Sequence, residues 1–329
     1  MTTANTRTVL IVDGVRVADS DLLAPVAEGL GLELLTAVDR GPGELTALAE
    51  SADVLIVKAA HVSRQLLASS PRLRLVYRLG TLTSNIDTEA AAELGIEVRT
   101  TPIPSAIAVA EHTFCLMLAV ERHLLQAHQS VLAGTRLPGL EPKRTTELSY
   151  AYNWAGLPPA TLLYGKTLGL IGVGEIGAQV AIRAAAFGMK TLYHKRNRLS
   201  RELENQLCVS YRPLVELLPE VDVLSLHLPY SSATDKLLNR DRLKLMRSSA
   251  ILINTARGGL VDEAALVDAL SSGALAAAGL DVFQFEPLPD DSKLLQLGNV
   301  VLTPHMAGAG MEAWRETLRA VIEDIAGAP

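Results

Sequence analysis

Aromatic residues are scarce in this chain. Phe, Trp and Tyr make up 4% of its 329 residues, whereas hydrophobic residues in total make up 49%. The core must therefore be built mainly from Ala, Val, Leu and Ile, which suits helices packed on a parallel sheet and argues against an aromatic-rich β-sandwich. The length predicts two domains, and a chain of this size can bury enough surface to need no disulfide or metal for stability.

Cysteine and positive charge are also in short supply. The chain has two cysteines, Cys115 and Cys208. They match no metal-ligand spacing, so we expect no metal site, and their small number fits a reducing compartment. Lys and Arg total 30 against 36 Asp and Glu, a net charge of −6. No basic tail or stripe is present, which argues against a nucleic-acid partner.

No long uninterrupted hydrophobic run is present either. The chain is polar from Met1 to Arg7, so no secretory signal is visible there. The most apolar segment is interrupted by Glu111 and His112, which argues against a membrane span. From these features we expect a cytoplasmic protein that does not bind a membrane.

Short strands and helices alternate along most of the chain. The first series has expected strands at 8–13, 32–36, 54–58, 73–78 and 96–99, with helices at 20–29, 44–50 and 88–94. A second series begins at Lys166, with strands at 168–171, 191–194, 223–227, 250–254, 277–281 and 300–302, and a final helix at 311–326. This alternation predicts an α/β fold with parallel sheets covered by helices on both faces.

Two segments break the alternation. Residues 106–132 are rich in Ala, Leu, Val and Met and predict one long helix, buried between domains or in the interface of a homodimer. Residues 134–161 are polar and carry several prolines, which predicts a long connection or arm. Within it, Trp154 could reach a substrate pocket or anchor an interface, and we favour the interface.

A glycine motif opens the second series. After the strand at 168–171, the sequence Gly-Val-Gly-Glu-Ile-Gly leads into an apolar helix. In that setting the glycines allow a tight turn, close approach of a pyrophosphate, and close packing of helix on strand, while the start of the helix attracts phosphates. The alternative is a glycine-rich turn without a ligand. We assign cofactor binding to Gly172, Gly174, Glu175, Ile176 and Gly177.

The next strand bears on the choice of cofactor. An acidic residue about 20 positions after the glycines would bind the ribose 2′-hydroxyl of NAD. Here the strand is followed instead by Lys195, Arg196 and Arg198. Cations attract a 2′-phosphate, so the sequence favours NADP over NAD, with Lys195 and Arg196 as the contacts. The alternative is that these cations belong to a solvated loop.

Three residues that could carry chemistry follow later strands. They are Arg257, Glu286 and His305. Arginine can bind a carboxylate with its planar fork, and histidine can exchange a proton with a neighbouring oxygen. A carboxylate beside the imidazole favours its protonated form. Each residue could separately be structural, but their common position after strands of a nucleotide-binding series favours a shared catalytic site.

These segments together resemble the D-2-hydroxyacid dehydrogenase family, which includes glyoxylate/hydroxypyruvate reductases and phosphoglycerate dehydrogenases. The matching stretches are AVAEHTFCLMLA, LGLIGVGEIGAQVA, VDVLSLHLP, LINTARGGLVDEAAL, LDVFQFEPLP and NVVLTPHMAG, and the similarity covers nearly the whole chain. It implies a Rossmann-type cofactor domain, residues 106–302, inserted into a flavodoxin-like substrate domain, residues 1–105 and 303–329, both doubly wound.

The resemblance also implies an activity and individual roles. The activity is hydride transfer between a nicotinamide cofactor and C2 of a small 2-keto or 2-hydroxy acid. Arg257 would bind substrate, His305 would be the acid/base and Glu286 its partner. Asp281 would face the nicotinamide carboxamide side of the cofactor site. The cleft would be lined further by His227, Pro229, Thr255 and Ala256.

The sequence departs from the family in one loop. Many members have Gly-x-Gly-x-Asp-Asn-Ile-Asp for the substrate carboxylate, whereas this chain reads GTLTSNID from Gly80. Leu82 replaces a glycine and Ser84 a carboxylate, although the backbone of Leu82 and Thr83 could still bind a carboxylate. Two other functions stay open: the same fold acting on a formate- or phosphite-type hydride donor, and a dinucleotide-sensing scaffold with little turnover.

Overall fold

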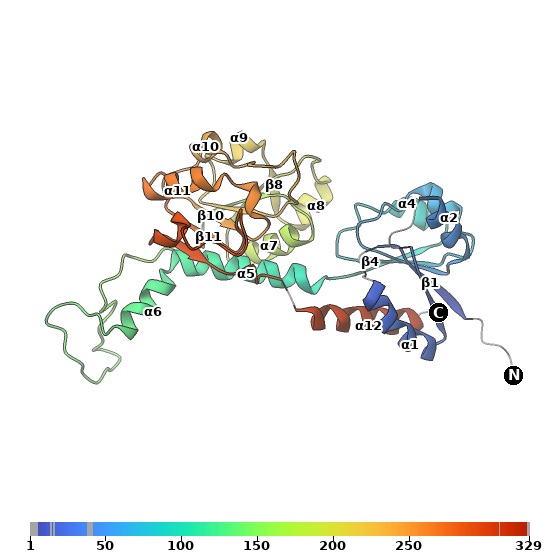
Figure 1. Ribbon diagram of the computed structural model, residues 1–329, viewed down its shortest axis with the longest axis horizontal. Helices are drawn as coiled ribbons and strands as arrows, with labels where there is room; N and C mark the ends of the chain where they lie inside the picture. The colour runs from blue at the N-terminus through green and yellow to red at the C-terminus, as the bar shows by residue number, and fades with distance from the viewer. Residues whose placement is uncertain (1–5, 14, 16, 38–41, 309, 328–329) are drawn as a thin grey trace. The chain divides into compact units, whose positions relative to one another are not determined.

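The computed structural model describes residues 6–13, 15, 17–37, 42–308 and 310–327, so most of the polar N-terminal stretch lies outside the described residues. The chain forms two compact units: unit 1 comprises Met1–Ile107 and Ala309–Pro329, and unit 2 comprises Ala108–Gly308. Figure 1 shows that each unit contains a sheet flanked by helices, and the predicted α/β class with two parallel-sheet domains is confirmed.

The division differs from the expected one at its second boundary. We expected the outer domain to resume at residue 303, but residues 303–308, including His305, belong to unit 2. The reason is that the amides of Thr303 and His305 donate to the carbonyls of Leu280 and Asp281, at 2.9 and 2.8 Å. These hydrogen bonds attach the segment to the end of the neighbouring strand.

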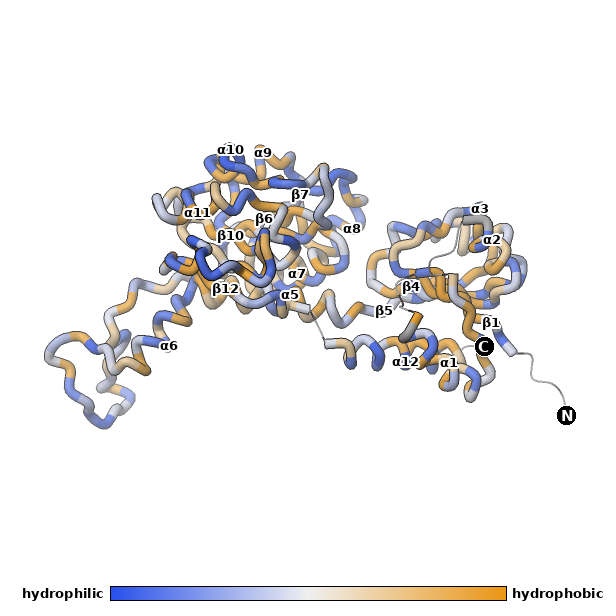
Figure 2. The backbone as a smooth tube through the Cα atoms, in the orientation of Figure 1, coloured by the Kyte–Doolittle hydropathy of each residue, from blue (hydrophilic) through white to orange (hydrophobic). Residues whose placement is uncertain are grey.

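Unit 1 is built on a five-stranded parallel sheet in the order β2-β1-β3-β4-β5. Its strands are β1 (Arg7–Ile11), β2 (Leu32–Thr36), β3 (Val54–Val57), β4 (Leu75–Leu79) and β5 (Glu97–Thr101). The strands β1 and β4 appear as apolar segments in Figure 2. Such continuous apolar runs fit strands covered on both faces.

Helices cover both faces of this sheet. Helices α1 (Val17–Gly29) and α12 (Met311–Gly327) pack on one face, and α2 (Pro42–Ser51), α3 (Arg64–Ala68) and α4 (Thr88–Glu93) pack on the other. Successive side chains of β1 alternate between the two cores: Val9 and Ile11 contact the first, and Leu10 contacts the second. Burying each such side chain stabilises the fold by about 1.5–3 kcal/mol.

Unit 2 is built on a seven-stranded parallel sheet in the order β12-β11-β10-β9-β6-β7-β8. Its strands are β6 (Thr167–Ile171), β7 (Lys190–His194), β8 (Val209–Tyr211), β9 (Val223–Leu226), β10 (Ile251–Asn254), β11 (Ala277–Leu280) and β12 (Val300–Leu302). The strand order reverses direction at β6, and ligands of open α/β sheets bind outside the carboxyl ends of the strands at such a point.

The helices between these strands are short. They are α7 (Glu175–Ala186), α8 (Arg201–Gln206), α9 (Leu214–Leu217), α10 (Arg240–Leu243) and α11 (Glu263–Ser271), with 3₁₀ turns at Gly258–Leu260 and Lys293–Gln296. Buried leucines, valines and alanines form the core between α11 and the sheet, including Leu266 and Leu270. The core thus has the aliphatic composition that the scarcity of aromatic residues predicts.

The expected single helix over residues 106–132 is wrong, because two helices occupy this stretch. They are α5 (Pro104–Glu121) and α6 (Leu124–Leu132), separated where His123 adopts a left-handed φ of 50°. Helix α5 is long and apolar enough to cross a membrane by length and composition, yet 56% of it is buried inside the protein, as in a core helix. Gly279 of β11 lets it approach, since an added Cβ would lie 2.9 Å from Leu116 Cβ.

Residues 134–161 form an extended arm, as expected. The range contains no helix or strand beyond an isolated bridge between Thr146 and Ser149. Most of its side chains are exposed, including Leu148 and Tyr152 at 99% and 86%. Trp154 is about one-third exposed, and its carbonyl accepts a hydrogen bond from the amide of Leu137 within the same arm.

Candidate active site

The carboxyl edge of the seven-stranded sheet gathers nearly all of the predicted site residues. Parallel strands all end at the same edge, so residues that follow them in sequence converge there. The glycine turn follows β6, Lys195 and Arg196 follow β7, His227 and Pro229 follow β9, Thr255, Ala256 and Arg257 follow β10, Asp281 and Glu286 follow β11, and His305 follows β12. This convergence is what the strand pattern predicts for a ligand site.

The glycine turn has no room for side chains at two positions. Gly172 has a φ of +93°, and a Cβ added there would lie 2.3 Å from the carbonyl oxygen of His227. A Cβ on Gly177 would lie 2.5 Å from the carbonyl oxygen of Gly172. Gly174, by contrast, faces open space and precedes α7 without any side-chain cap. A backbone turn open at a helix N-terminus fits the pyrophosphate of a dinucleotide.

His227 lies directly beneath this turn. Its side chain is buried, its ring Nε2 lies 2.9 Å from Ser225 Oγ, and its amide donates to the carbonyl of Ile171. Burial lowers the pKa of His227 to about 3, so the ring is neutral at physiological pH. The neighbouring Pro229 is exposed at the sheet edge. His227 therefore packs against the glycine turn as a neutral residue.

The cations after β7 have different environments. Lys195 is half-buried, donates from Nζ to the carbonyl of Val173 at 3.1 Å, and has its pKa lowered by burial. Arg198 forms a two-point ion pair with Glu204, at 2.8 and 2.9 Å, which raises its pKa. Arg196 is exposed. Lys195 therefore contacts the glycine turn directly, while Arg198 is engaged by Glu204.

The side chain of Asn254 stabilises the loop that carries Arg257 through two hydrogen bonds. The Asn254 side chain donates to the carbonyl of Arg257 at 2.9 Å and accepts from the amide of Ala256 at 3.0 Å. Gly258 packs against the backbone of Phe283, since an added Cβ would lie 1.9 Å from its carbonyl carbon. The backbones of the Arg257 loop and the Glu286 loop are thus in close contact. The Arg257 side chain itself remains exposed.

Glu286 and His305 form the one direct contact within the predicted triad. Glu286 Oε2 lies 2.6 Å from His305 Nδ1, and Oε1 accepts from the amide of Phe283 at 3.0 Å. Burial on its own would raise the pKa of Glu286. The hydrogen bonds from His305 and Phe283 and the charges of His305 and Arg257 outweigh it and lower the pKa. Glu286 is therefore ionised at neutral pH.

Asp281 directly follows β11 at the carboxyl edge of the sheet, and its role toward the nicotinamide carboxamide stays a prediction of the family resemblance. Its side chain is fully buried, and its carboxylate accepts from the Thr303 hydroxyl and from the amides of Met306 and Ala307, at 2.6, 3.0 and 2.9 Å. The carboxylate thus holds the loop around His305. Our sequence reasoning missed Asn254 and Thr303, although a polar residue at the end of a buried strand is a signal that could have found them.

The predicted substrate loop belongs to unit 1. Leu82 and Thr83 follow β4 at the carboxyl edge of that unit's sheet, and the carbonyl of Thr83 accepts from the amide of Ile86 at 2.9 Å. Asn85 braces the loop: its side chain accepts from Arg78 Nε and donates to the carbonyl of Ala60. Leu82 and Thr83 are half-buried.

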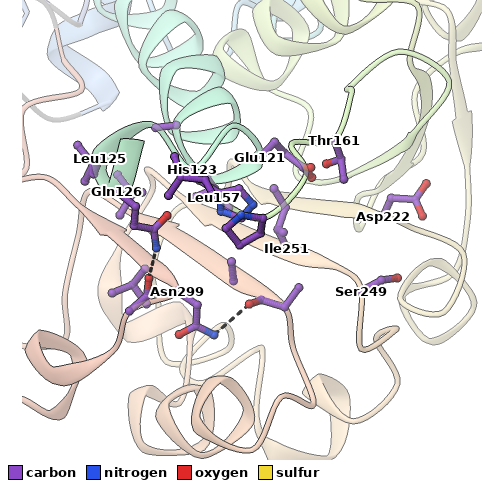
Figure 3. A pocket seen from close by; sticks show the side chains of 18 of the residues that line it. Glu121, His123, Leu125, Gln126, Leu157, Thr161, Asp222, Ser249, Ile251 and Asn299 are labelled. Carbon is purple, nitrogen blue, oxygen red and sulfur yellow. Dashed lines mark hydrogen bonds between the residues drawn. The ribbon is translucent and has the colours of Figure 1, made fainter. Parts of the chain in front are cut away.

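A cavity of about 710 Å³ lies at the opposite, amino edge of the seven-stranded sheet, and it contains none of the predicted site residues. Figure 3 shows Glu121, His123 and Gln126, from the α5–α6 junction, beside Leu157 of the arm and Ile251 of β10. No cluster of three potential metal ligands occurs among the residues that the structure describes. The cavity and the predicted site residues of unit 2 therefore lie at opposite edges of the sheet.

The parallel sheet, the glycine turn at its central strand and the His305–Glu286 pair at the same edge define a dinucleotide-dependent oxidoreductase. Residues 114–307 match the model of the D-isomer specific 2-hydroxyacid dehydrogenase NAD-binding domain. The chain belongs to this family, and its cofactor is a nicotinamide dinucleotide.

Individual relatives agree with this assignment. The chain is 42% identical to a glyoxylate reductase of Aeropyrum pernix, over 82% of this chain and 77% of that protein. It is 39% identical to a hydroxypyruvate reductase of Thermotoga maritima, over 86% of each chain. Among solved structures it resembles D-lactate dehydrogenase of Aquifex aeolicus in complex with NAD and lactic acid, with 30% identity, a TM-score of 0.55 and coverage of 97% of this chain and 95% of that one.

Proposed function

We propose that this protein reduces small 2-keto acids of the glyoxylate and hydroxypyruvate type to D-2-hydroxy acids, with NADPH preferred over NADH. The observation that carries the proposal is the 2.6 Å contact between Glu286 and His305 at the sheet edge that also presents the glycine turn and Arg257. Keto-acid reduction requires a proton donor, a cation that binds the substrate carboxylate, and a backbone turn that binds the dinucleotide.

The contacts and the family resemblance support the following roles. When bound, the reduced nicotinamide supplies a hydride to C2 of the keto acid. Arg257 binds the substrate carboxylate with its guanidinium. His305 gives a proton to the C2 oxygen as that oxygen gains negative charge. Since His305 Nδ1 faces Glu286 at 2.6 Å, Nε2 is the nitrogen left to serve the substrate. The ionised Glu286 fixes the ring orientation and stabilises the imidazolium before the transfer.

Two further assignments rest on position. Lys195 and Arg196 follow the strand beside the glycine turn, where the adenosine ribose binds in folds of this kind, and they supply charge for a 2′-phosphate. A contact between the substrate carboxylate and the backbone amides of Leu82 and Thr83 stays a prediction of the family resemblance. The Leu82 side chain narrows this loop relative to a glycine, so small substrates are favoured over bulky ones.

The test is cofactor oxidation by purified protein, with NADPH and NADH in parallel and glyoxylate, hydroxypyruvate, pyruvate and bulkier 2-keto acids as substrates. We expect turnover with glyoxylate and hydroxypyruvate and a higher kcat/KM with NADPH. Cofactor binding without turnover across this panel would contradict the proposal and favour a dinucleotide sensor. Turnover with formate or phosphite as the hydride donor would favour the other alternative.

We also propose that the protein is a homodimer through α6 and the arm. None of the residues of α6 is buried, and Leu124, Leu125, Val131 and Leu132 are each at least half exposed. Apolar residues exposed together on one helix and its adjoining arm are typical of an interface that a second copy covers. Light scattering should give twice the monomer mass, and Leu125→Glu with Leu132→Glu should give the monomer mass. A monomeric parent protein would contradict this assembly.

A further inference from the structure

A chain of polar contacts connects helix α5 to the loop that carries His305. His112 Nε2 lies 2.9 Å from Thr303 Oγ1, and Thr303 Oγ1 donates to Asp281 Oδ1 at 2.6 Å. His112 Nε2 is also 3.5 Å from Asp281 Oδ1, and its side chain is only 15% exposed. His112 is one of the polar residues that interrupt the apolar run of α5, and the proposed mechanism does not use it.

The direction of these hydrogen bonds follows from the number of hydrogens that each side chain can donate. The Thr303 hydroxyl has a single hydrogen, which it donates to Asp281. It must therefore accept a hydrogen bond from His112, so the proton of the His112 ring lies on Nε2. The order is His112 to Thr303 to Asp281, in which each group donates to the next.

Asp281 in turn holds an unfavourable backbone conformation at His305. His305 has a left-handed φ of 51°, a conformation that is unfavourable for a residue with a side chain and persists only where its surroundings enforce it. The carbonyl of Asp281 accepts from the His305 amide at 2.8 Å, and its carboxylate accepts from the amides of Met306 and Ala307. Three consecutive amides are thus bound to one residue, whose carboxylate is oriented by Thr303.

From this geometry we propose that His112 is a positioning residue for the proton transfer: through Thr303 and Asp281 it holds the His305 loop in the conformation that sets the imidazole against Glu286. This inference rests on the proposed role of His305. It assigns His112 no contact with substrate or cofactor. Its effect is therefore on turnover and on the order of the loop, with little effect on cofactor affinity.

The test compares His112→Leu, which removes the donor, with His112→Gln, which keeps an N–H donor near the place of Nε2. We expect His112→Leu to lower kcat about tenfold, the effect of losing one hydrogen bond that orients a charged group, with cofactor Kd and substrate KM within about twofold of the parent. His112→Gln should retain most of the activity. Cys115→Ala, at an exposed position on the same helix, is the control and should match the parent.

A second readout is independent of turnover. Hydrogen exchange of the peptide that spans residues 303–308 should be faster in His112→Leu than in the parent, and unchanged in Cys115→Ala. Thr303→Val should reproduce both effects, and adding His112→Leu to it should cause no further loss of kcat because both act through the same contacts.

The outcomes separate this inference from the proposed function. A parent protein with no keto-acid turnover would overturn the proposed function, while faster exchange in His112→Leu would still support the coupling to the loop. Parent-like kcat and exchange in His112→Leu would overturn the positioning role. An equal loss of kcat in His112→Leu and His112→Gln would overturn it as well, because the hydrogen bond would then not be the cause.

Discussion

The two edges of the seven-stranded sheet in unit 2 differ in chemistry. At the carboxyl edge, Arg257, Glu286 and His305 lie on loops that are held by backbone hydrogen bonds and glycine contacts, and their side chains remain open to solvent. At the amino edge lies a cavity of about 710 Å³ with mostly apolar walls. Its buried Glu121 is already paired with Lys166, whose Nζ lies 2.5 Å away.

This difference favours strand direction over cavity size as a guide to the proposed site. Loops after parallel strands converge at one edge, and their polar groups can be turned toward a ligand. At the amino edge the charged groups neutralise each other within the protein. Substitutions at the carboxyl edge should therefore change turnover, and those at the amino edge should change stability.

The largest effect is expected from His305→Ala. Removing the proton donor should lower kcat by about 10²- to 10⁴-fold, because no other group at this edge replaces it. Steady-state oxidation of NADPH with glyoxylate measures the loss, and cofactor binding should stay close to that of the parent. A variant with parent-like turnover would exclude His305 from the mechanism.

Arg257→Ala should have the next largest effect. A hydrogen bond to a charged group contributes about 1.5–3 kcal/mol, so kcat/KM should fall roughly 10- to 150-fold, with a raised KM and a lower kcat. Titration with NADPH should show nearly unchanged affinity, because the proposed contact is with substrate alone. Arg257→Lys is the matched variant, and it should recover only part of the activity since it lacks the planar fork. Unchanged kinetics in Arg257→Ala would contradict the assignment.

Lys166→Met provides the contrast at the amino edge. Its substitution leaves Glu121 buried without its partner charge, which should reduce the free energy of unfolding by roughly 3–5 kcal/mol. The kcat of the folded fraction should be unaffected. Urea denaturation measures the first effect, and the double variant Lys166→Met with Glu121→Leu should recover stability. A large loss of kcat at parent-like stability would show that the two edges are not functionally separate.

A smaller, pH-dependent effect is expected at His227. The folded protein binds a proton there only near pH 3, whereas the unfolded chain does so near the ordinary pKa of 6.5. Between these values the unfolded state binds more protons, so the free energy of unfolding should fall as the pH drops from 6.5 toward 3. His227→Gln should lose this part of the slope. Parallel stability–pH curves for the two proteins would contradict the burial of a neutral ring.

The sequence was sufficient to predict the main features of unit 2. Every predicted strand is present, because short aliphatic runs between turn residues are read from local composition alone. The contact between Glu286 and His305 was also foreseeable, since both residues follow adjacent strands of a parallel sheet. The glycine turn was predicted from its place between a strand and a helix.

Other features depend on contacts that a linear pattern does not contain. The break between α5 and α6 occurs at His123 without a proline or glycine, so the apolar pattern continues across it. Arg198 pairs with Glu204, which removes it from the cation cluster seen in the sequence. Asp281 serves the loop after β12, 22 positions away at Thr303, and that pairing exists only once β11 and β12 are neighbours.

The most direct test of keto-acid reduction follows the hydride itself. A single turnover of hydroxypyruvate with NADPH that carries two deuterium atoms at nicotinamide C4 should yield D-glycerate with one deuterium at C2, and His305→Ala should form it far more slowly under the same conditions. Product without deuterium at C2, or of the L configuration, would contradict direct hydride transfer by a D-specific 2-hydroxyacid dehydrogenase.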